Sequence, residues 1–239
     1  MNRSHDFYYT HKDKKTTLPK LDIIDDVELT NTLFSSDIPY IELDININLD
    51  EWQQEADLAK DYLVLHREEQ DHYGWRSCCI HGLGVEKTGI YHKYTDKDEG
   101  YHWTELSDLT PTIKQFWLDF PFEKLYRVRF MELGPYGFID PHNDSPEQKP
   151  DNLLNHIIPV NIAIEHPDDC YFTLENHGIV PFHNGKLNII NITNTHNVVN
   201  FSDKPRMHMI AHGYVGNKIN EFSQLIGRSY RKQYGRIHQ

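Results

Sequence analysis

The stretch from about residue 122 to 216 places the strongest constraint on the fold. It consists of short runs rich in Ile, Val, Phe and Tyr, separated by Gly, Pro, Asn and Asp. Runs of this length and composition are typical of strands, and no helical pattern interrupts them. Seven strands are predicted, over Leu125–Leu133, His156–Glu165, Tyr171–Glu175, Ile179–His183, Lys186–Thr193, His196–Phe201 and Arg206–Val215. Consecutive strands without intervening helices favour an antiparallel sandwich or barrel, so the fold is predicted to be mainly β.

Helical spacing of apolar residues occurs on either side of this stretch. Three helices are predicted, over Asp50–Glu69, from near Asp108 with Pro111 in its first turn, and over Ile219–Tyr234. Residues 1–20 are polar and are expected to form a flexible arm. No repeat and no linker rich in Pro or Gly divides the remainder. Residues 21–239 are therefore expected to be a single domain, with a β core at about 122–216 and a C-terminal helix at about 218–234.

Net charge and the length of the apolar runs each argue against one class of partner. Lys and Arg number 24 against 36 Asp and Glu, a net charge of −12, which repels the phosphates of nucleic acids. No apolar run reaches 18 residues, so no membrane span is expected. The segment Lys218–Gln239 is locally basic, with five Lys or Arg against Glu221. It is expected to be a solvated face or a partner for acidic surface of the same protein, and a nucleic-acid patch is the less favoured alternative.

The cysteines and the N-terminus bear on localisation. Three cysteines, two of them adjacent, make a poor disulfide framework: Cys78, Cys79 and Cys170. Free thiols suit a reducing compartment, and the polar N-terminus lacks the apolar stretch of a signal peptide, so a cytoplasmic location is expected. The sequence has no P-loop, and Gly82-Leu83-Gly84 lacks the third glycine of a dinucleotide-binding turn.

The histidines contain a candidate metal site. A mononuclear iron(II) oxygenase site needs two histidines and one carboxylate, and an H-x-D triplet on a strand supplies two of these ligands on one face. Three triplets occur, beginning at His11, His142 and His166. The first lies in the polar arm, and the third has a proline between its candidate ligands and only 30 residues before His196. A fourth pattern, His66-Arg67-Glu68, falls at a predicted helix end, where residues i and i+2 diverge.

The triplet formed by His142 and Asp144 has the most favourable context. It follows a strand, and 54 residues separate His142 from His196, which is enough chain for the strands that would bring His196 back beside it. In the last predicted strand, one face carries four residues: Arg206, His208, Ile210 and His212. An arginine that points into a barrel needs an anion, and a dicarboxylate co-substrate would supply one. Taken alone, Arg206 is better explained by a buried Arg–Asp pair or an exposed edge strand than by a co-substrate. Together with His142, Asp144 and His196, the co-substrate is favoured.

Several spaced motifs resemble one family. The runs Arg127–Pro135, Pro141–Asp144, His156–Val160, Thr195–Ser202 and Pro205–His208, with His66–Gly82 upstream, are similar to the aspartyl/asparaginyl β-hydroxylases, which are 2-oxoglutarate- and iron(II)-dependent oxygenases. The resemblance implies a double-stranded β-helix, or jelly-roll, core with flanking helices. It implies His142, Asp144 and His196 as ligands of Fe(2+).

The same resemblance implies how the co-substrate is bound and used. Arg206 would bind the distal carboxylate of 2-oxoglutarate, and His156 and His208 are further candidates for contacts with it. Many members carry an arginine just before the position of His156, where Leu154 and Asn155 stand here. O2 would be the oxidant, and succinate and CO2 the co-products.

The substrate is open at this stage, between a free amino acid or other small molecule and a peptidyl Asp or Asn. Four residues are either core or line the mouth of the site: Trp75, Arg76, Tyr101 and Trp103. Of Arg127 and Arg129, which share a face with Met131, one binds a substrate carboxylate or forms a structural ion pair, and the two alternatives are equally favoured. Two other classes compete with the oxygenase. One is a non-catalytic jelly-roll that binds a metal or ligand, and the other is a zinc hydrolase, which would have no use for Arg206.

Overall fold

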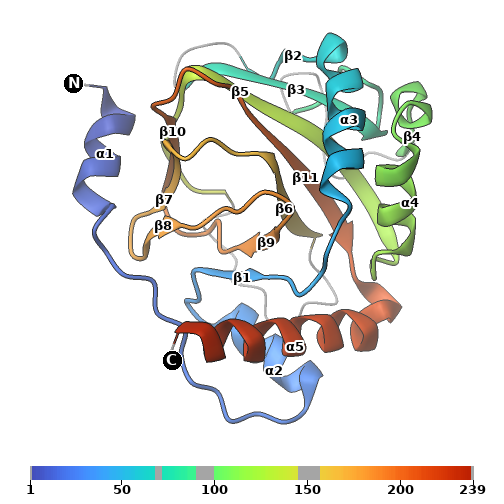
Figure 1. The fold of residues 1–239 in the computed structure, drawn as a ribbon. Helices are drawn as coiled ribbons and strands as arrows, with labels where there is room; N and C mark the ends of the chain where they lie inside the picture. Colours follow the sequence, from blue (N-terminus) through green and yellow to red (C-terminus); the bar gives the residue numbers. More distant parts are fainter. Residues whose placement is uncertain (1, 68–71, 90–99, 145–156, 238–239) are drawn as a thin grey trace.

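The computed structural model describes residues 2–67, 72–89, 100–144 and 157–237. Within them, eleven strands form one antiparallel sheet that curls into a nearly closed barrel (Figure 1). The main path of the sheet runs β1-β9-β6-β11-β5-β10-β7-β8, and β3 pairs with β5, β2 and β4. The strands are β1 (Tyr40–Glu42), β2 (Val64–Leu65), β3 (His72–Gly82), β4 (His102–Trp103), β5 (Lys124–His142), β6 (Ile157–Glu165), β7 (Cys170–Leu174), β8 (Gly178–Val180), β9 (Leu187–Ile190), β10 (His196–Asn200) and β11 (Arg206–Tyr214).

The predicted β core is confirmed. The seven strands expected from the sequence are β5 to β11, in the same order. Their bounds agree within one residue except that β5 continues to His142 and that β8 and β9 end three residues earlier than predicted. Two of the three predicted helices also match the structure. Helix α4 (Pro111–Asp119) begins at Pro111, whose fixed backbone suits a first helical turn, and α5 spans Ile219–Ile237.

The sequence did not predict β2, β3 and β4. The helix predicted over Asp50–Glu69 is shorter: α3 (Leu49–Ala59) is followed by a 3-10 turn at Lys60–Tyr62 and then by β2. Pairing explains the difference, because Val64 lies opposite Ser77 and Leu65 opposite Arg76 of β3. The helix therefore ends at Ala59, because the residues that follow it extend the sheet by pairing with β3.

The expectation of a flexible N-terminal arm is corrected for residues 3–11, which form helix α1 (Arg3–His11). Asn2 caps this helix by accepting a hydrogen bond from the Ser4 amide. The Tyr8 ring is buried and stacks on Tyr171 at 4.8 Å, and Asn197 donates to the Ser4 carbonyl at 2.7 Å. Figure 1 shows α1 beside β7 and β10. A few long-range contacts thus fix a segment whose own composition is polar.

Helices cover the outer face of the sheet. The alternation predicted for β11 is confirmed: Met207, Met209 and Ala211 point to this side and are buried in the main core beneath the helices. Helix α5 packs against α2 (Asp26–Ser35) and β1 (Figure 1), with the buried side chains of Phe222, Leu225 and Ile226. No helix of the described residues is long and apolar enough to cross a membrane.

The basic residues of α5 have acidic partners in this chain. Arg231 contacts Asp26 at 2.7 Å, Arg236 contacts Glu42 at 3.0 Å, and Lys232 forms an ion pair with Asp44. The expectation that this segment pairs with acidic surface of the same protein is therefore met for these three side chains.

Candidate metal centre and adjoining basic pocket

A break in β5 brings the predicted metal ligands together. The first half of β5 pairs with β11, and its last residues pair with β10, with His142 opposite His196. Between the two halves, Tyr136 has a positive φ of 55°, and a Cβ at Gly137 would lie 2.8 Å from two backbone carbonyl oxygens. Gly137 is therefore the residue that lets the strand turn there and carry His142 to β10.

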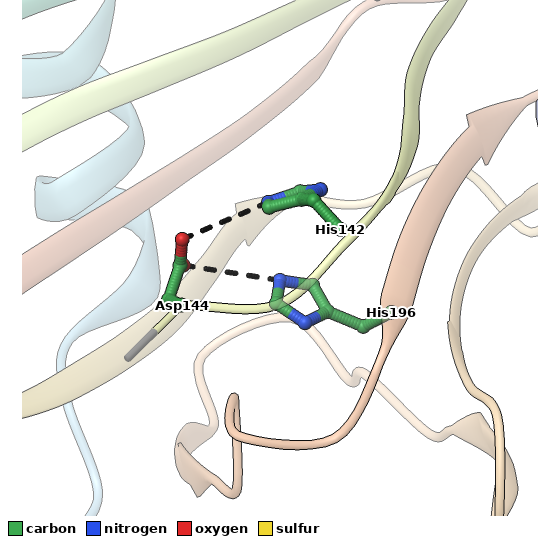
Figure 2. A group of neighbouring side chains, drawn as sticks. All are labelled: His142, Asp144 and His196. Carbon is green, nitrogen blue, oxygen red and sulfur yellow. Dashed lines mark ion pairs between the residues drawn. The ribbon is translucent and has the colours of Figure 1, made fainter. Parts of the chain in front are cut away.

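Figure 2 shows His142, Asp144 and His196 converging from β5, the residues after it and β10. Their donor atoms all lie within 4.8 Å of one another. Asp144 Oδ1 is 4.0 Å from His142 Nε2, and Asp144 Oδ2 is 3.9 Å from His196 Nε2. Two donors that each bind one ion at about 2.1 Å lie no more than ~4.2 Å apart, so both spacings fit a shared ion. Among the described residues this is the only such group of three His, Cys, Asp or Glu.

Hydrogen bonds fix the tautomer of both histidines. The Nδ1 atom of His142 lies 2.7 Å from the Asp140 carbonyl, and that of His196 lies 3.0 Å from the Asn194 carbonyl. A carbonyl only accepts, so each Nδ1 carries the proton and donates it. In the neutral ring, Nε2 then carries a free lone pair on the side of Asp144. Metal-binding histidines are commonly held in this way, with the other ring nitrogen donating to a carbonyl.

The charge of His196 fits a cation at this position. The side chain is 4% exposed and stacks on Phe172 at 5.1 Å. Burial, and then the nearby His142, lower the pKa of His196 to about 4, so the ring is neutral at pH 7. The lone pair of the neutral His196 ring and the carboxylate of Asp144 would face one another without a balancing positive charge between them. A divalent metal ion supplies that charge, so the donor set fits one.

A turn at residues 191–194 supports two of the three ligands. The Asp144 amide donates to the Ile192 carbonyl at 3.0 Å, and the Asn194 carbonyl accepts from His196. The turn is itself held by Asp37, whose Oδ1 accepts from the Asn194 side-chain amide at 3.0 Å and from that of Asn191 at 3.4 Å. Sequence reasoning missed Asp37 and this turn, although the clustered asparagines of Asn191-Ile-Thr-Asn194 are a turn signal.

Arg206 lies buried at the start of β11, 6% exposed, opposite Leu133 of β5. Since β11 lies between β5 and β6, the alternative of an exposed edge strand is wrong. No Asp or Glu of the described residues forms an ion pair with Arg206, and its Nε is buried without a hydrogen-bond partner among them. Burial lowers the pKa of Arg206 to about 10, so it remains a cation at pH 7. The structure thus holds a buried positive charge that fits an anion.

Two phenylalanine rings lie between this arginine and the candidate metal ligands. Phe172, which stacks on His196, lies 6.0 Å from Phe182, and the guanidinium of Arg206 lies over the Phe182 ring at 5.6 Å. His208, on the same face of β11, accepts a hydrogen bond from Arg206 at Nδ1 (2.7 Å). His156, the sixth predicted site residue, lies outside the described residues, as do Leu154 and Asn155.

The remaining candidates have varied surroundings. His11 lies in α1, and His66 follows β2 and contacts Ser77 Oγ at 2.8 Å, so neither joins the metal group. Arg76 pairs with Glu132, and Trp75 lies against His66.

The other aromatic and basic candidates also have partners within the protein. Trp103 contacts His81, and Tyr101 contacts Tyr126. Arg129 is buried and donates to the Thr88 carbonyl, and it shares the inner face of β5 with Arg127. The three cysteines are buried free thiols, and none belongs to the metal group.

Comparisons with known proteins point to one family. Residues 44–214 match the model of a family described as Aspartyl/Asparaginyl beta-hydroxylase. No curated protein matches the chain.

One solved structure shares the fold at low sequence identity, and others are similar at lower TM-scores. An oxidoreductase of the 2OG-Fe(II) oxygenase family from Burkholderia pseudomallei has a TM-score of 0.50 at 12% identity, over 85% of this chain and 97% of that one. A Pseudomonas putida prolyl-4-hydroxylase has a TM-score of 0.44 at 12% identity, over 79% and 98%. HygX from Streptomyces hygroscopicus, solved with nickel and 2-oxoglutarate bound, has 0.46 at 11%, over 78% and 86%.

Proposed function

Since the chain belongs to the aspartyl/asparaginyl β-hydroxylase family of 2-oxoglutarate- and iron(II)-dependent oxygenases, we propose that it hydroxylates an amino-acid-like or peptidyl substrate of the Asp/Asn type. The observation that carries this proposal is the convergence of two histidines and one carboxylate in the barrel. When bound, iron(II) and 2-oxoglutarate supply the activation of O2 and the oxidation of the substrate, with succinate and CO2 as co-products.

The protein's own contribution is to hold and orient. His142 and His196 would offer Nε2 to the iron, because the backbone carbonyls of Asp140 and Asn194 hold the proton of each ring on Nδ1. Asp144 would bring one negative charge, which leaves the centre cationic and receptive to an anionic co-substrate. Three protein ligands leave further coordination positions open, as an oxygenase requires and a closed structural site does not.

Arg206 would bind the distal carboxylate of 2-oxoglutarate. Its planar fork matches a carboxylate, and the described residues give it no carboxylate partner of their own. His208 would orient the guanidinium from the same face of β11. We include His156 as a further co-substrate contact on the family resemblance alone.

The Asp/Asn type of substrate rests on the family and on the basic inner face of β5, where Arg127 and Arg129 lie. A substrate carboxylate would find complementary charge there. We also propose that the protein works in a reducing cytoplasm, in accord with three buried free thiols.

Turnover of 2-oxoglutarate tests the proposal. Protein reconstituted anaerobically with iron(II) is exposed to O2 and 2-oxoglutarate, and succinate is measured first without substrate and then with free Asp, free Asn and peptides that contain them. We expect slow succinate formation alone, faster formation with a substrate, and a product 16 Da heavier (one added oxygen atom). Binding of 2-oxoglutarate without any succinate would favour the non-catalytic binding module instead. No dependence on iron or 2-oxoglutarate would overturn the proposal.

A further inference from the structure

Arg206 is the first member of a chain of three side chains that ends on the backbone. Its Nη2 lies 2.7 Å from Nδ1 of His208, and Nε2 of His208 lies 2.8 Å from Nδ1 of His166. Nε2 of His166 lies 2.8 Å from the carbonyl oxygen of Cys170. His166 follows β6 and Cys170 begins β7, so the chain of hydrogen bonds crosses the inside of the barrel from β11 to β7.

The direction of every bond in this chain follows from its last link. The Cys170 carbonyl only accepts, so His166 carries its proton on Nε2 and accepts at Nδ1. His208 must then donate from Nε2 and accept at Nδ1, which is where the guanidinium donates. Each ring uses one donor and one acceptor, and all three bonds are satisfied only when both rings are neutral.

The surroundings keep both rings neutral. Burial, and then the positive charge of Arg206, lower the pKa of His166 to about 3 and that of His208 well below its usual value. Phe182 covers the three side chains, with its ring 5.3 Å from that of His166 and 4.6 Å from that of His208. A ring that gained a second proton would lose an acceptor and add a positive charge beside a buried arginine.

A neutral partner orients the arginine without cancelling its charge. An Asp or Glu in the place of His208 would also hold the guanidinium, but it would neutralise the cation and compete with an incoming carboxylate. The histidine takes up one N–H of Arg206 and leaves the charge and the other donors for a ligand, including the buried Nε. This is the requirement for a site that must bind a dicarboxylate and release its product.

We propose that His166 is a positioning residue for the co-substrate: through His208 it holds the Arg206 guanidinium in the orientation that binds the distal carboxylate of 2-oxoglutarate. The inference rests on the proposed function and extends it to a residue outside the metal centre. It also gives a role to His166-Pro167-Asp168, the third H-x-D triplet of the sequence, whose histidine serves the arginine and not a metal.

The test uses His166→Phe, which keeps a ring of similar size and removes both hydrogen bonds. The affinity for 2-oxoglutarate is measured on the anaerobic iron(II) protein by the metal-to-ligand charge-transfer band, and iron affinity is measured separately by competition with a chelator. We expect about a tenfold weaker affinity for 2-oxoglutarate, because one buried hydrogen bond to a charged group is misaligned, and an unchanged iron affinity.

Three comparisons separate positioning from a general loss of structure. His166→Gln has one acceptor and one donor in similar places, so its affinity should stay within about threefold of wild type. Binding of 2-oxobutyrate, which lacks the distal carboxylate, should not change in His166→Phe. In an Arg206→Ala background, His166→Phe should weaken 2-oxoglutarate binding no further. His183→Phe, at an exposed histidine near His166, is the matched control and should behave as wild type.

The outcomes also distinguish this inference from the proposed function. A wild-type protein that binds no 2-oxoglutarate would overturn both. A wild-type protein that binds it through Arg206, together with a folded His166→Phe of unchanged affinity, would overturn the role of His166 alone. If His166→Phe does not fold, His166→Asn keeps the site polar but is too short to bridge His208 and Cys170, and an unchanged affinity in that variant would overturn the role equally.

Discussion

Asp37 accepts a hydrogen bond from the side-chain amide of Asn194 at 3.0 Å, and the backbone carbonyl of the same Asn194 accepts the Nδ1 proton of His196. Asp37 follows α2 and precedes the segment that matches the family model, which begins at residue 44. A side chain outside the matched region therefore holds a turn that orients a candidate metal ligand. Its contribution depends on the contact between the N-terminal segment and the barrel.

Replacement of Asp37 should weaken metal binding without unfolding the protein. In Asp37→Ala the turn loses two hydrogen bonds from Asn191 and Asn194, so the orientation of His196 and Asp144 becomes less fixed. Loss of outer-shell partners usually weakens metal binding about 10- to 100-fold, and we expect about tenfold for this more distant contact. Iron(II) affinity, measured by chelator competition, checks it, with the exposed Asp203→Ala as control. Equal affinities in the two variants would contradict the assigned role.

The candidate metal ligands themselves should show a much larger effect. His142→Ala and His196→Ala should each abolish stoichiometric iron(II) binding, because each removes one of the three donors that converge on the site. His142 is partly exposed, so that variant should remain folded by circular dichroism. The iron content after anaerobic reconstitution is the measurement, with His183→Ala as the control. Full occupancy in both variants would reopen the choice of ligands.

Substitution of Arg206 should separate co-substrate binding from iron binding. Lysine keeps the charge but loses the planar fork, so Arg206→Lys should weaken 2-oxoglutarate binding by about tenfold or more. Arg206→Ala should do worse, since a carboxylate would be left buried without a cation. Iron affinity should change little in either variant. The exposed Arg228→Lys is a matched control. An unchanged binding midpoint in Arg206→Ala would rule out the assignment of this residue to the co-substrate.

The strands of the barrel could be predicted because their signals are local. Turn residues separate β5 to β11, and the alternation of Arg206, Met207 and His208 assigns the two faces of β11 before any contact is known. The long span from His142 to His196 was also sufficient to bring these two ligands together. Each of these inferences depends on spacing along a single stretch of chain.

The features that the sequence did not predict depend on distant partners. Strand β3 is buried at every position from Ser77 to Gly82, so it lacks the alternation of a half-buried strand. Helix α1 has little apolar surface of its own and is held by contacts with residues near 140, 171 and 197. His166 is considered in the sequence only as a disfavoured metal ligand of its triplet, and its hydrogen-bonding neighbour, His208, is 42 residues away.

Helix α5 should be part of the stability of the barrel. Phe222 is completely buried between α2, Phe122 and the sheet, so Phe222→Ala should lower the free energy of unfolding by about 3–5 kcal/mol. Gln224→Ala, two residues away on the exposed side of the helix, should change it by no more than about 0.5 kcal/mol. Urea unfolding of both variants checks the expectation. Similar losses in the two variants would show that α5 is not docked through Phe222.

The buried histidines should make the metal-free protein sensitive to mild acid. Burial, and then the positive charges of Arg127 and Arg129, lower the pKa of His212 well below its usual value. Burial and Arg206 act in the same direction on His208 and His166. In the unfolded chain these side chains take up protons below about pH 6.5, whereas in the folded protein they remain neutral. The unfolded state therefore binds more protons, and stability must fall as the pH is lowered from about 6.5.

Each of these histidines should contribute up to about 1.4 kcal/mol of lost stability per pH unit below 6.5. His212→Asn removes one titrating group, so its free energy of unfolding should depend less steeply on pH than that of the wild type between pH 6 and pH 5. His183→Asn, at an exposed position, should keep the wild-type slope. Urea unfolding in the presence of a chelator, at pH 7, 6 and 5, gives the three slopes. A His212→Asn slope equal to that of the wild type would mean that His212 is protonated in the folded protein, in contradiction to the charges placed around it.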